Sequence, residues 1–285
     1  MIEPAGLEAT LGAAYATGVD GPIGMFDSGF GGLTVARALI DLCPTEDLVY
    51  IGDTGRYPYG PRTVEEVRGF AHEMSRSLVE DYGVKMIVVA CNTAAAAEPV
   101  EVLAQEFAIP VVGVIEPGAR ALVSATNTGR IGVIGTVGTV RSGSYQRVIS
   151  SLSPSAQLTV AACPGLVEFV EKGETSGEQI AVLTERLLAP VHDAKVDALL
   201  LGCTHYPFLA RVIAEVMGPD VVLVSSADET AFEVRSLLAR LGMPRASKEL
   251  GTHTWLSSGD TATFARLGRQ LLGPELDSVQ KWKPK

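Results

Sequence analysis

The chain has 285 residues, enough for one large α/β domain or two smaller ones with a full hydrophobic core. Hydrophobic residues make up 47% of the sequence and charged residues 20%, which is typical of a globular protein and excludes a largely disordered one. The net charge is −10 and no long basic block occurs, so a nucleic-acid groove is excluded as the main site.

The first twenty residues contain three acids and no lysine or arginine. A secretory signal needs a basic start and an apolar centre, so this segment does not match one. We expect residues 1–20 to be a disordered extension. No apolar run approaches the roughly 20 residues that span a bilayer, so we expect no membrane segment. We expect a cytoplasmic protein whose four cysteines are reduced.

From residue 23 to residue 224, apolar runs of strand length alternate with amphipathic patterns of helical length. Such alternation predicts an α/β fold with mostly parallel sheets flanked by helices. The clearest helix begins at Thr63, which forms a capping box with Glu66. We expect strands at residues 23–26, 48–51, 86–90, 111–114, 131–134, 158–161, 198–201 and 221–224. We expect helices at residues 33–42, 63–82, from 92 onward, near 142–149, near 178–192 and up to 217.

Two segments of the chain repeat in the same order. Residues 21–26 resemble residues 129–134, at an offset of 108, and the segment that ends in Cys91 resembles the one that ends in Cys203, at an offset of 112. This repetition predicts two similar lobes with the active site in the cleft between them. We assign residues 21–117 and 227–285 to the first lobe and residues 118–226 to the second.

Cys91 and Cys203 occupy equivalent places, each after an apolar strand and before a helix. Ligands of open α/β sheets bind at the carboxyl ends of the strands, so two facing lobes would bring both thiols to one cleft. A helix N-terminus stabilises a thiolate, and we expect both thiols to have a lowered pKa. A cysteine with a pKa near neutral can act as a general acid or base.

A cysteine after a strand is more often a small buried packing residue, but the duplicated polar context favours function here. Zinc binding by the two thiols and His205 is a weaker alternative, because no paired Cys/His spacing supports it. Cys43 is predicted to be structural. Cys163 precedes Pro164 and belongs either to a site loop or to the core.

Residues 27–32, DSGFGG, follow the first strand and open a helix. They lack the lysine of a Walker motif and the GxGxxG spacing, so the glycines more plausibly let the backbone approach a small anion. Asp27 can bind a substrate ammonium and Ser28 can donate to a carboxylate, or both only cap the helix. Thr136 and Thr139 likewise supply donors or only start a helix.

Taken alone, Tyr57–Pro61 predicts a structural turn and Glu168–Glu174 a solvated helix face.

A pyridoxal enzyme needs a Schiff-base lysine in the pocket. Lys85 and Lys195 precede their strands, so they should lie away from the cleft, and only Lys172 falls near it. We therefore expect an enzyme without pyridoxal phosphate.

With these residues assembled, the chain resembles glutamate racemase, of the aspartate/glutamate racemase superfamily. The CTHYP motif is similar to the glutamate enzymes rather than the aspartate ones, in which an acid commonly follows the second Cys-Thr. The matching segments are FDSGFGGLTV (Phe26–Val35), GDTGRYPYGPRT (Gly52–Thr63), VVACNTAAA (Val88–Ala96), IGVIGTVGTVRSGSY (Ile131–Tyr145), CPGLVEFVEKGE (Cys163–Glu174) and LLLGCTHYPFL (Leu199–Leu209).

The resemblance implies that Cys91 and Cys203 are the two catalytic acid/bases, assisted by Asp27, His205 and Glu171. Many members of the family have proline where this chain has Glu168, which leaves open which acid faces the site. The fold implied is two similar α/β lobes around a buried cleft. The residues implied to bind glutamate are Asp27, Ser28, Tyr59, Gly60, Asn92, Thr93, Thr204 and His205.

The implied reaction interconverts L- and D-glutamate with no metal, nucleotide or other cofactor. One thiolate removes the α-proton and the opposite thiol delivers a proton to the other face, Cys203 acting on L-glutamate and Cys91 on D-glutamate. The D-glutamate would feed bacterial peptidoglycan synthesis. The resemblance suggests a homodimer and no nucleic-acid or membrane partner.

Three alternatives remain from the sequence. The first is a superfamily relative acting on aspartate, a hydantoin or maleate. The second is a binding protein that has lost turnover, against which the intact cysteine pair argues. The third is a thiol hydrolase, which needs one nucleophile rather than two symmetric thiols.

Overall fold

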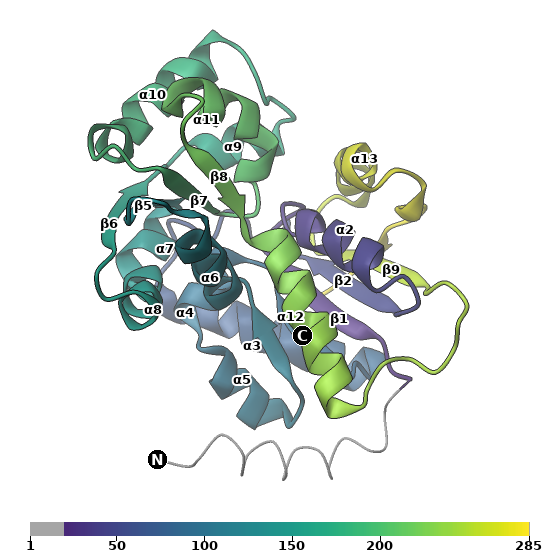
Figure 1. The fold of residues 1–285 in the computed structure, drawn as a ribbon. Helices are drawn as coiled ribbons and strands as arrows, with labels where there is room; N and C mark the ends of the chain where they lie inside the picture. The colour runs from purple at the N-terminus through teal and green to yellow at the C-terminus, as the bar shows by residue number, and fades with distance from the viewer. Residues whose placement is uncertain (1–19, 285) are drawn as a thin grey trace.

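The computed structural model describes residues 20–284 and consists of two lobes, each built on a parallel sheet flanked by helices (Figure 1). The α/β class and the two-lobe architecture predicted from the sequence are therefore confirmed. Of the extension predicted over residues 1–20, all but residue 20 lies outside the described residues. Among the described helices, none combines the length and the apolar character needed to cross a membrane.

The first sheet has six strands in the order β10-β9-β2-β1-β3-β4. Its strands are β1 (Ile23–Asp27), β2 (Leu48–Gly52), β3 (Met86–Val89), β4 (Val111–Gly113), β9 (His253–Ser257) and β10 (Gln280–Lys281). The helices that follow these strands are α2 (Leu33–Leu42), α3 (Val64–Tyr82), α4 (Asn92–Ala97), α5 (Val100–Phe107) and α13 (Thr261–Leu272), with a 3-10 turn at Gly273–Glu275.

The second sheet has four strands in the order β6-β5-β7-β8. Its strands are β5 (Arg130–Gly135), β6 (Gln157–Ala162), β7 (Ala198–Gly202) and β8 (Val222–Ser225). The helices of this half of the chain are α6 (Ile115–Ala125), α7 (Val137–Ser142), α8 (Ser144–Leu152), α9 (Leu166–Glu171), α10 (Glu178–Asp193) and α11 (Ala210–Met217), with a 3-10 helix at Tyr206–Leu209.

The strand order accounts for the duplication seen in the sequence. In the first sheet β1 pairs with β2 and β3, and β4 follows β3. In the second sheet β5 pairs with β6 and β7, and β8 follows β7, so its order corresponds to that of β2-β1-β3-β4 in the first sheet. Strands β3 and β7 are therefore equivalent, and each leads directly into one cysteine of the pair, Cys91 or Cys203.

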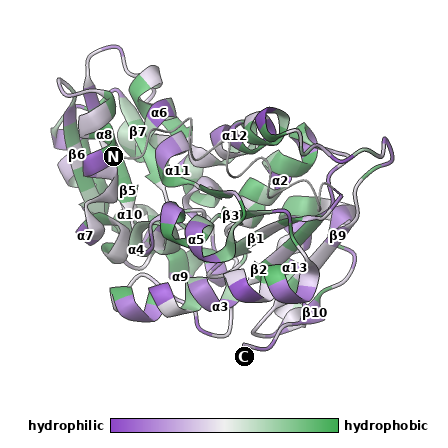
Figure 2. Cartoon of the chain, turned by 90° about the horizontal axis from the view of Figure 1, so that it is seen from below, coloured by the Kyte–Doolittle hydropathy of each residue, from purple (hydrophilic) through white to green (hydrophobic). Residues whose placement is uncertain are grey.

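The central strands form because they are short apolar runs that parallel sheets bury on both faces. Strands β1, β2, β3 and β7 are buried along their whole length. Figure 2 shows the apolar residues concentrated on the strands and the polar residues on the outer faces of the helices. Helix α3 begins at the predicted capping box: Thr63 Oγ1 accepts from Glu66 N, and Glu66 Oε2 accepts from Thr63 N.

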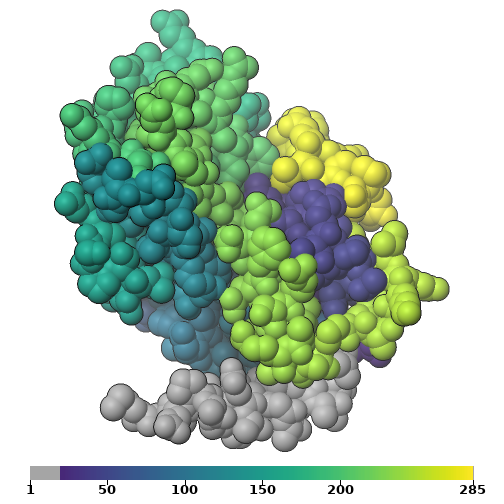
Figure 3. Space-filling view, viewed as in Figure 1, coloured from purple at the N-terminus to yellow at the C-terminus, as the bar shows by residue number. Residues whose placement is uncertain are grey.

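The segment after residue 225 returns to the first sheet. Helix α12 (Ser226–Leu241) packs against α2 and α6, and α13 also packs against α2. Figure 3 shows α2, in purple, between α12 in green and α13 in yellow. Because α12 contacts elements of both lobes, the exact division at residues 117/118 and 226/227 stays a prediction.

Candidate active site

A pocket of about 110 Å³ lies between the lobes, at the carboxyl ends of strands β1 and β3 on one side and β5 and β7 on the other. This volume is below the roughly 300–1,000 Å³ of sites for drug-sized ligands, so the pocket suits a small molecule. All the predicted site residues except two line it: Ser28, Tyr59, Gly60, Cys91, Asn92, Thr93, Cys203, Thr204 and His205. The two exceptions, Asp27 and Glu171, lie behind lining residues and bind them.

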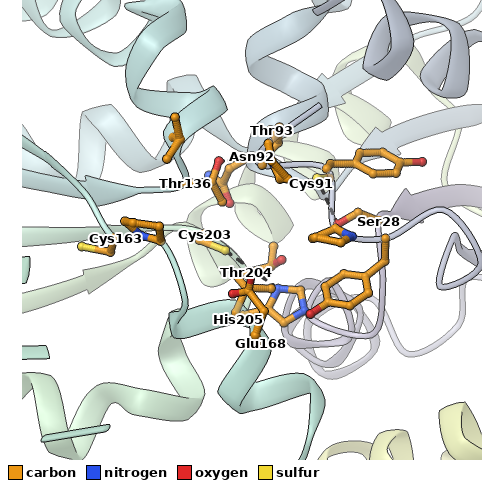
Figure 4. A pocket seen from close by; sticks show the side chains of 18 of the residues that line it. Ser28, Cys91, Asn92, Thr93, Thr136, Cys163, Glu168, Cys203, Thr204 and His205 are labelled. Atoms are coloured by element: carbon orange, nitrogen blue, oxygen red, sulfur yellow. Dashed lines mark hydrogen bonds between the residues drawn. The ribbon is translucent and has the colours of Figure 1, made fainter. Parts of the chain in front are cut away.

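The two cysteines approach the pocket from different lobes. In Figure 4, Cys91 and Ser28 lie on one side of the pocket and Cys203 lies on the other. Both cysteine residues are buried, with 4% and 6% of their surface exposed. A small molecule in the pocket would therefore meet a thiol on each of two sides.

Cys91 directly precedes the six-residue helix α4, and its thiol donates to Ser28 Oγ at 3.6 Å. Burial raises the pKa of Cys91 to about 12, and the charge of Asp27 adds to this rise. Hydrogen bonds from Ala94 N and Ser28 lower the pKa but do not outweigh burial. The prediction of a lowered pKa is therefore wrong for Cys91, because one short helix in a dry site stabilises a thiolate less than burial destabilises it.

Cys203 has a different partner set. Its sulfur lies 3.8 Å from His205 Nδ1, and His205 Nε2 lies 2.6 Å from Glu171 Oε1. Burial lowers the pKa of His205, but the hydrogen bonds and charges of Cys203 and Glu171 outweigh burial and raise it well above its usual range. The raised pKa of His205 favours its protonated form, and a positive charge at this place stabilises negative charge that develops in the pocket.

Helix α9 explains which acid reaches this group. Glu171 is the last residue of α9, and its side chain is 13% exposed. It therefore faces inward and does not belong to the solvated helix face predicted for Glu168–Glu174. Glu168, one turn earlier, is exposed and lines the pocket (Figure 4). The sequence left open which acid faces the site, and the structure gives each a different place. Glu171 binds His205, and Glu168 lines the pocket.

Asp27, at the end of β1, is fully buried and connects the two lobes. Its Oδ1 accepts from Gly29 N at 2.8 Å, and its Oδ2 accepts from Thr204 Oγ1 of the other lobe at 3.0 Å. Burial raises the pKa of Asp27, although His205 and the two hydrogen bonds act against this rise. In this pocket Asp27 orients Thr204 instead of reaching the cavity directly.

Polar groups cross between the lobes on the opposite side of the pocket. Thr93 Oγ1 lies 2.9 Å from Thr136 Oγ1, which begins helix α7. Asn92 Nδ2 donates to the hydroxyl of Tyr145 at 2.8 Å, while the buried Asn92 Oδ1 has no hydrogen-bond partner among the described residues. An acceptor left unpaired beside a cavity is available to a ligand that donates.

Several residues at the pocket were not assigned to the site by the sequence pattern alone. Tyr57–Pro61, which alone predicted only a structural turn, forms one wall of the pocket. Thr136 lines the pocket in addition to starting a helix, and Cys163 lines it beside Pro164. Tyr145 belongs to a segment that matches the family, but its hydrogen bond to Asn92 could not be predicted, because the contact arises only when α8 of one lobe meets α4 of the other.

The lining of the pocket contains few charged side chains. Among the described residues that line it there is no lysine or arginine, so the donors available to ligand carboxylates are hydroxyl groups, amides, backbone N–H groups and the His205 ring. Within residues 20–284 no cluster of three or more His, Cys, Asp or Glu side chains is arranged to hold a metal ion.

Known proteins match this chain along most of its length. The Asp/Glu/Hydantoin racemase family model matches residues 28–233. A glutamate racemase from Parafrankia sp. is 50% identical over 259 residues, which cover 90% of this chain and 93% of that protein. The crystal structure of glutamate racemase isoform RacE1 from Bacillus anthracis superposes with a TM-score of 0.85 at 40% identity, covering 92% of this chain and 97% of the other.

The likeness extends to a structure with a ligand. Glutamate racemase from Francisella tularensis, solved in complex with D-glutamate, superposes with a TM-score of 0.86 at 30% identity and covers 94% of this chain and 99% of the other. Family model, sequence and structure agree over the segment that carries both cysteines of the pocket. The chain therefore belongs to the Asp/Glu/Hydantoin racemase family and, within it, to the glutamate racemases.

Proposed function

We propose that this chain interconverts L- and D-glutamate without a cofactor and that Cys91 and Cys203 are its two acid/base groups. The names of its relatives support the substrate. One observation carries the mechanism: the thiols follow equivalent strands of the two lobes and face the same small pocket from two sides (Figure 4). This placement allows inversion at a carbon, because one group can take the α-proton from one face while the other group gives its own proton to the opposite face.

The two thiols have different environments in the free protein. Cys91, with a pKa of about 12, carries its proton at neutral pH. The sulfur of Cys203 lies 3.8 Å from Nδ1 of His205, whose pKa is raised well above its usual range by its hydrogen bonds and charged neighbours. We propose that Cys91 acts first as the acid and that Cys203, on the other side of the pocket, acts first as the base. We propose that this form takes L-glutamate and that the reverse reaction begins after one turnover has exchanged the two protonation states.

The pocket offers polar groups for the ammonium group and for the two carboxylates of glutamate. The ammonium group can donate to Asn92 Oδ1, which has no other partner among the described residues. A positive charge there also offsets the Asp27 carboxylate, which is one cause of the high pKa of Cys91. The hydroxyls of Ser28, Thr93 and Thr204 line the pocket and can donate to the two carboxylates. Preorganised donors in a dry site stabilise the carbanion that forms when the α-proton leaves.

The substrate assignment is tested by following optical rotation with L-glutamate, L-aspartate and a hydantoin at equal concentration and without added cofactor. We expect rotation to be lost with glutamate only, and the loss to disappear in Cys91→Ala and Cys203→Ala. Turnover of aspartate or a hydantoin in preference to glutamate would assign the chain to another activity of the family.

We also propose a cytoplasmic enzyme that supplies D-glutamate for peptidoglycan synthesis and acts as a homodimer. The four free, buried cysteines of the described residues fit a reducing compartment. The dimer is supported by the family resemblance alone. Light scattering coupled to size exclusion tests it, since a mass of one chain at micromolar concentration would contradict it.

A further inference from the structure

A buried carboxylate outside the pocket is placed to control one of its walls. Asp53 directly follows strand β2, and none of its surface is exposed. It does not line the pocket. Its backbone N–H donates to Asp27 O at 2.9 Å, so its position is fixed relative to the end of β1. A fully buried acid is costly unless its oxygens are paired, which raises the question of what this one holds.

The first partner of Asp53 is a pocket residue. Tyr59 lines the pocket, yet its hydroxyl donates to Asp53 Oδ2 instead of facing the cavity. Tyr59 therefore offers the substrate its ring and its backbone, while its only side-chain polar atom anchors the wall from behind. The next residue, Gly60, fits closely against the other lobe, since a Cβ there would lie 3.1 Å from Thr136 Cβ. A small shift of this wall would change the shape of the cavity.

Two further donors complete the pairing of Asp53. Arg56 Nε donates to Oδ2 at 2.6 Å, and Ser258 Oγ donates to Oδ1 at 2.6 Å. The Tyr59 hydroxyl and Arg56 Nε both donate to the same oxygen, Oδ2, so this oxygen must accept two hydrogen bonds. A carboxylate also matches the charge of Arg56, whereas an asparagine side chain keeps one acceptor oxygen and lacks that charge.

The C-terminal segment reaches the same cluster through Arg56. The guanidinium of Arg56 lies 4.2 Å from the ring centre of Phe70 and 5.6 Å from that of Trp282, and it pairs with Glu73. Trp282 follows β10 and is 5% exposed, with its backbone N–H donating to Ser257 O. Cation–π contacts of this kind hold a guanidinium against an aromatic face.

We propose that Asp53 is a positioning residue, which fixes the pocket wall of residues 57–61 through Tyr59 and Arg56, and that Trp282 couples the C-terminal strand to this wall. The readout rests on the proposed racemization of glutamate. The thiols and His205 lie in the turns that follow β3 and β7, outside this wall, so the wall affects how glutamate is bound and leaves the acid/base groups in place.

The test compares KM, kcat and pH profile in wild type, Asp53→Asn, Tyr59→Phe and the double variant. We expect each single variant to raise the KM for glutamate by roughly tenfold, as for one lost hydrogen bond to a charged group, with kcat within about threefold and the pH profile unchanged. Because Asp53 acts through Tyr59, the double variant should have a KM near that of Asp53→Asn, far below the product of the two effects.

Thr54→Val is the matched control. Thr54 is the next residue in the same loop, and its hydroxyl lies 2.7 Å from Ser257 Oγ and accepts from Gly259 N rather than bonding to the Asp53 carboxylate. We expect this variant to lower Tm without changing KM, which separates loss of a hydrogen bond from loss of positioning. Trp282→Leu should raise KM about threefold, and Trp282→Phe, which keeps an aromatic face for Arg56, should restore it.

Three results would overturn the inference: an unchanged KM in folded Asp53→Asn, effects of Asp53→Asn and Tyr59→Phe that simply multiply, or a KM in Thr54→Val that rises as much as theirs. If Asp53→Asn does not fold, the test rests on Tyr59→Phe, and an unchanged KM for glutamate in that variant contradicts the inference. An inactive wild-type protein would instead refute the proposed function, so the two failures are distinguishable.

Discussion

Replacing Glu171 with glutamine tests the charge that supports His205. The pair is buried, with Glu171 Oε1 2.6 Å from His205 Nε2. Glutamine keeps an oxygen that can accept from the ring but removes the negative charge. A hydrogen bond to a charged group contributes about 1.5–3 kcal/mol and a neutral one about 0.5–1.5 kcal/mol, so the variant loses about 1–1.5 kcal/mol. We expect kcat/KM for L-glutamate to fall roughly tenfold.

The pH dependence of Glu171→Gln gives a second, independent readout. Glu171 is one of the groups that raise the pKa of His205, so its neutralisation lowers that pKa. The imidazolium is then lost at a lower pH as pH rises, and the alkaline limb of kcat/KM should move to lower pH. The assay is the rate of change in optical rotation across pH, together with NMR titration of the His205 ring.

The control is Glu168→Gln, which removes a carboxylate one turn away that lines the pocket and has no bond to His205. We expect its alkaline limb to stay in place and its KM for glutamate to fall modestly at low salt, because one acid facing the substrate carboxylates is gone. An equal shift of the alkaline limb in both variants, or none in Glu171→Gln, would refute the role given to the His205–Glu171 pair.

Three further results are expected. Gly31→Ala should abolish activity, because its Cβ would collide with the His205 ring, whereas Gly69→Ala, which meets nothing within 4 Å, should keep activity and stabilise the helix by about 0.5–1 kcal/mol. At pH 8, iodoacetamide should modify Cys91, whose pKa is about 12, more slowly than Cys203, as measured by peptide mass spectrometry; the reverse order would contradict the protonated state of Cys91. Thr63→Ala should lower the free energy of unfolding by about 1 kcal/mol in thermal denaturation, with kcat unchanged.

Local signals predicted most of the fold. Helix α2 spans the predicted residues 33–42, and α3 begins at the Thr63 capping box, because periodicity and caps are properties of neighbouring residues. The helix predicted from residue 92 onward instead ends at Ala97, and α5 begins at Val100 after Pro99. Proline disfavours a helical conformation in the residue before it, so this break was readable in the sequence.

The sequence analysis predicts no helix at α6, although Glu116 and Pro117 in its first turn are residues typical of a helix start. The helix lies where the lobes meet and spans the boundary predicted at residues 117/118. The contact between Thr93 and Thr136 was also beyond sequence reasoning, since it depends on how closely the two lobes approach.

For the site, residue types and spacing pointed to the right segments but not to their electrostatics. The sign of the pKa shift at Cys91 depends on how deeply the sulfur is buried and on the nearby Asp27 charge, and both are properties of the assembled cleft. The inward position of Glu171 likewise depends on the rotation of α9, which three acids at helical spacing do not specify.

The most direct test of the two-thiol mechanism is incubation of the purified protein with L-glutamate in D₂O, followed by NMR of the α-proton and chiral analysis of the product. We expect the α-proton to be lost as D-glutamate appears, with deuterium in the product, and racemization to be absent in Cys91→Ala and Cys203→Ala. Racemization that persists in either variant, or a folded wild-type protein that exchanges no α-proton, would contradict the mechanism.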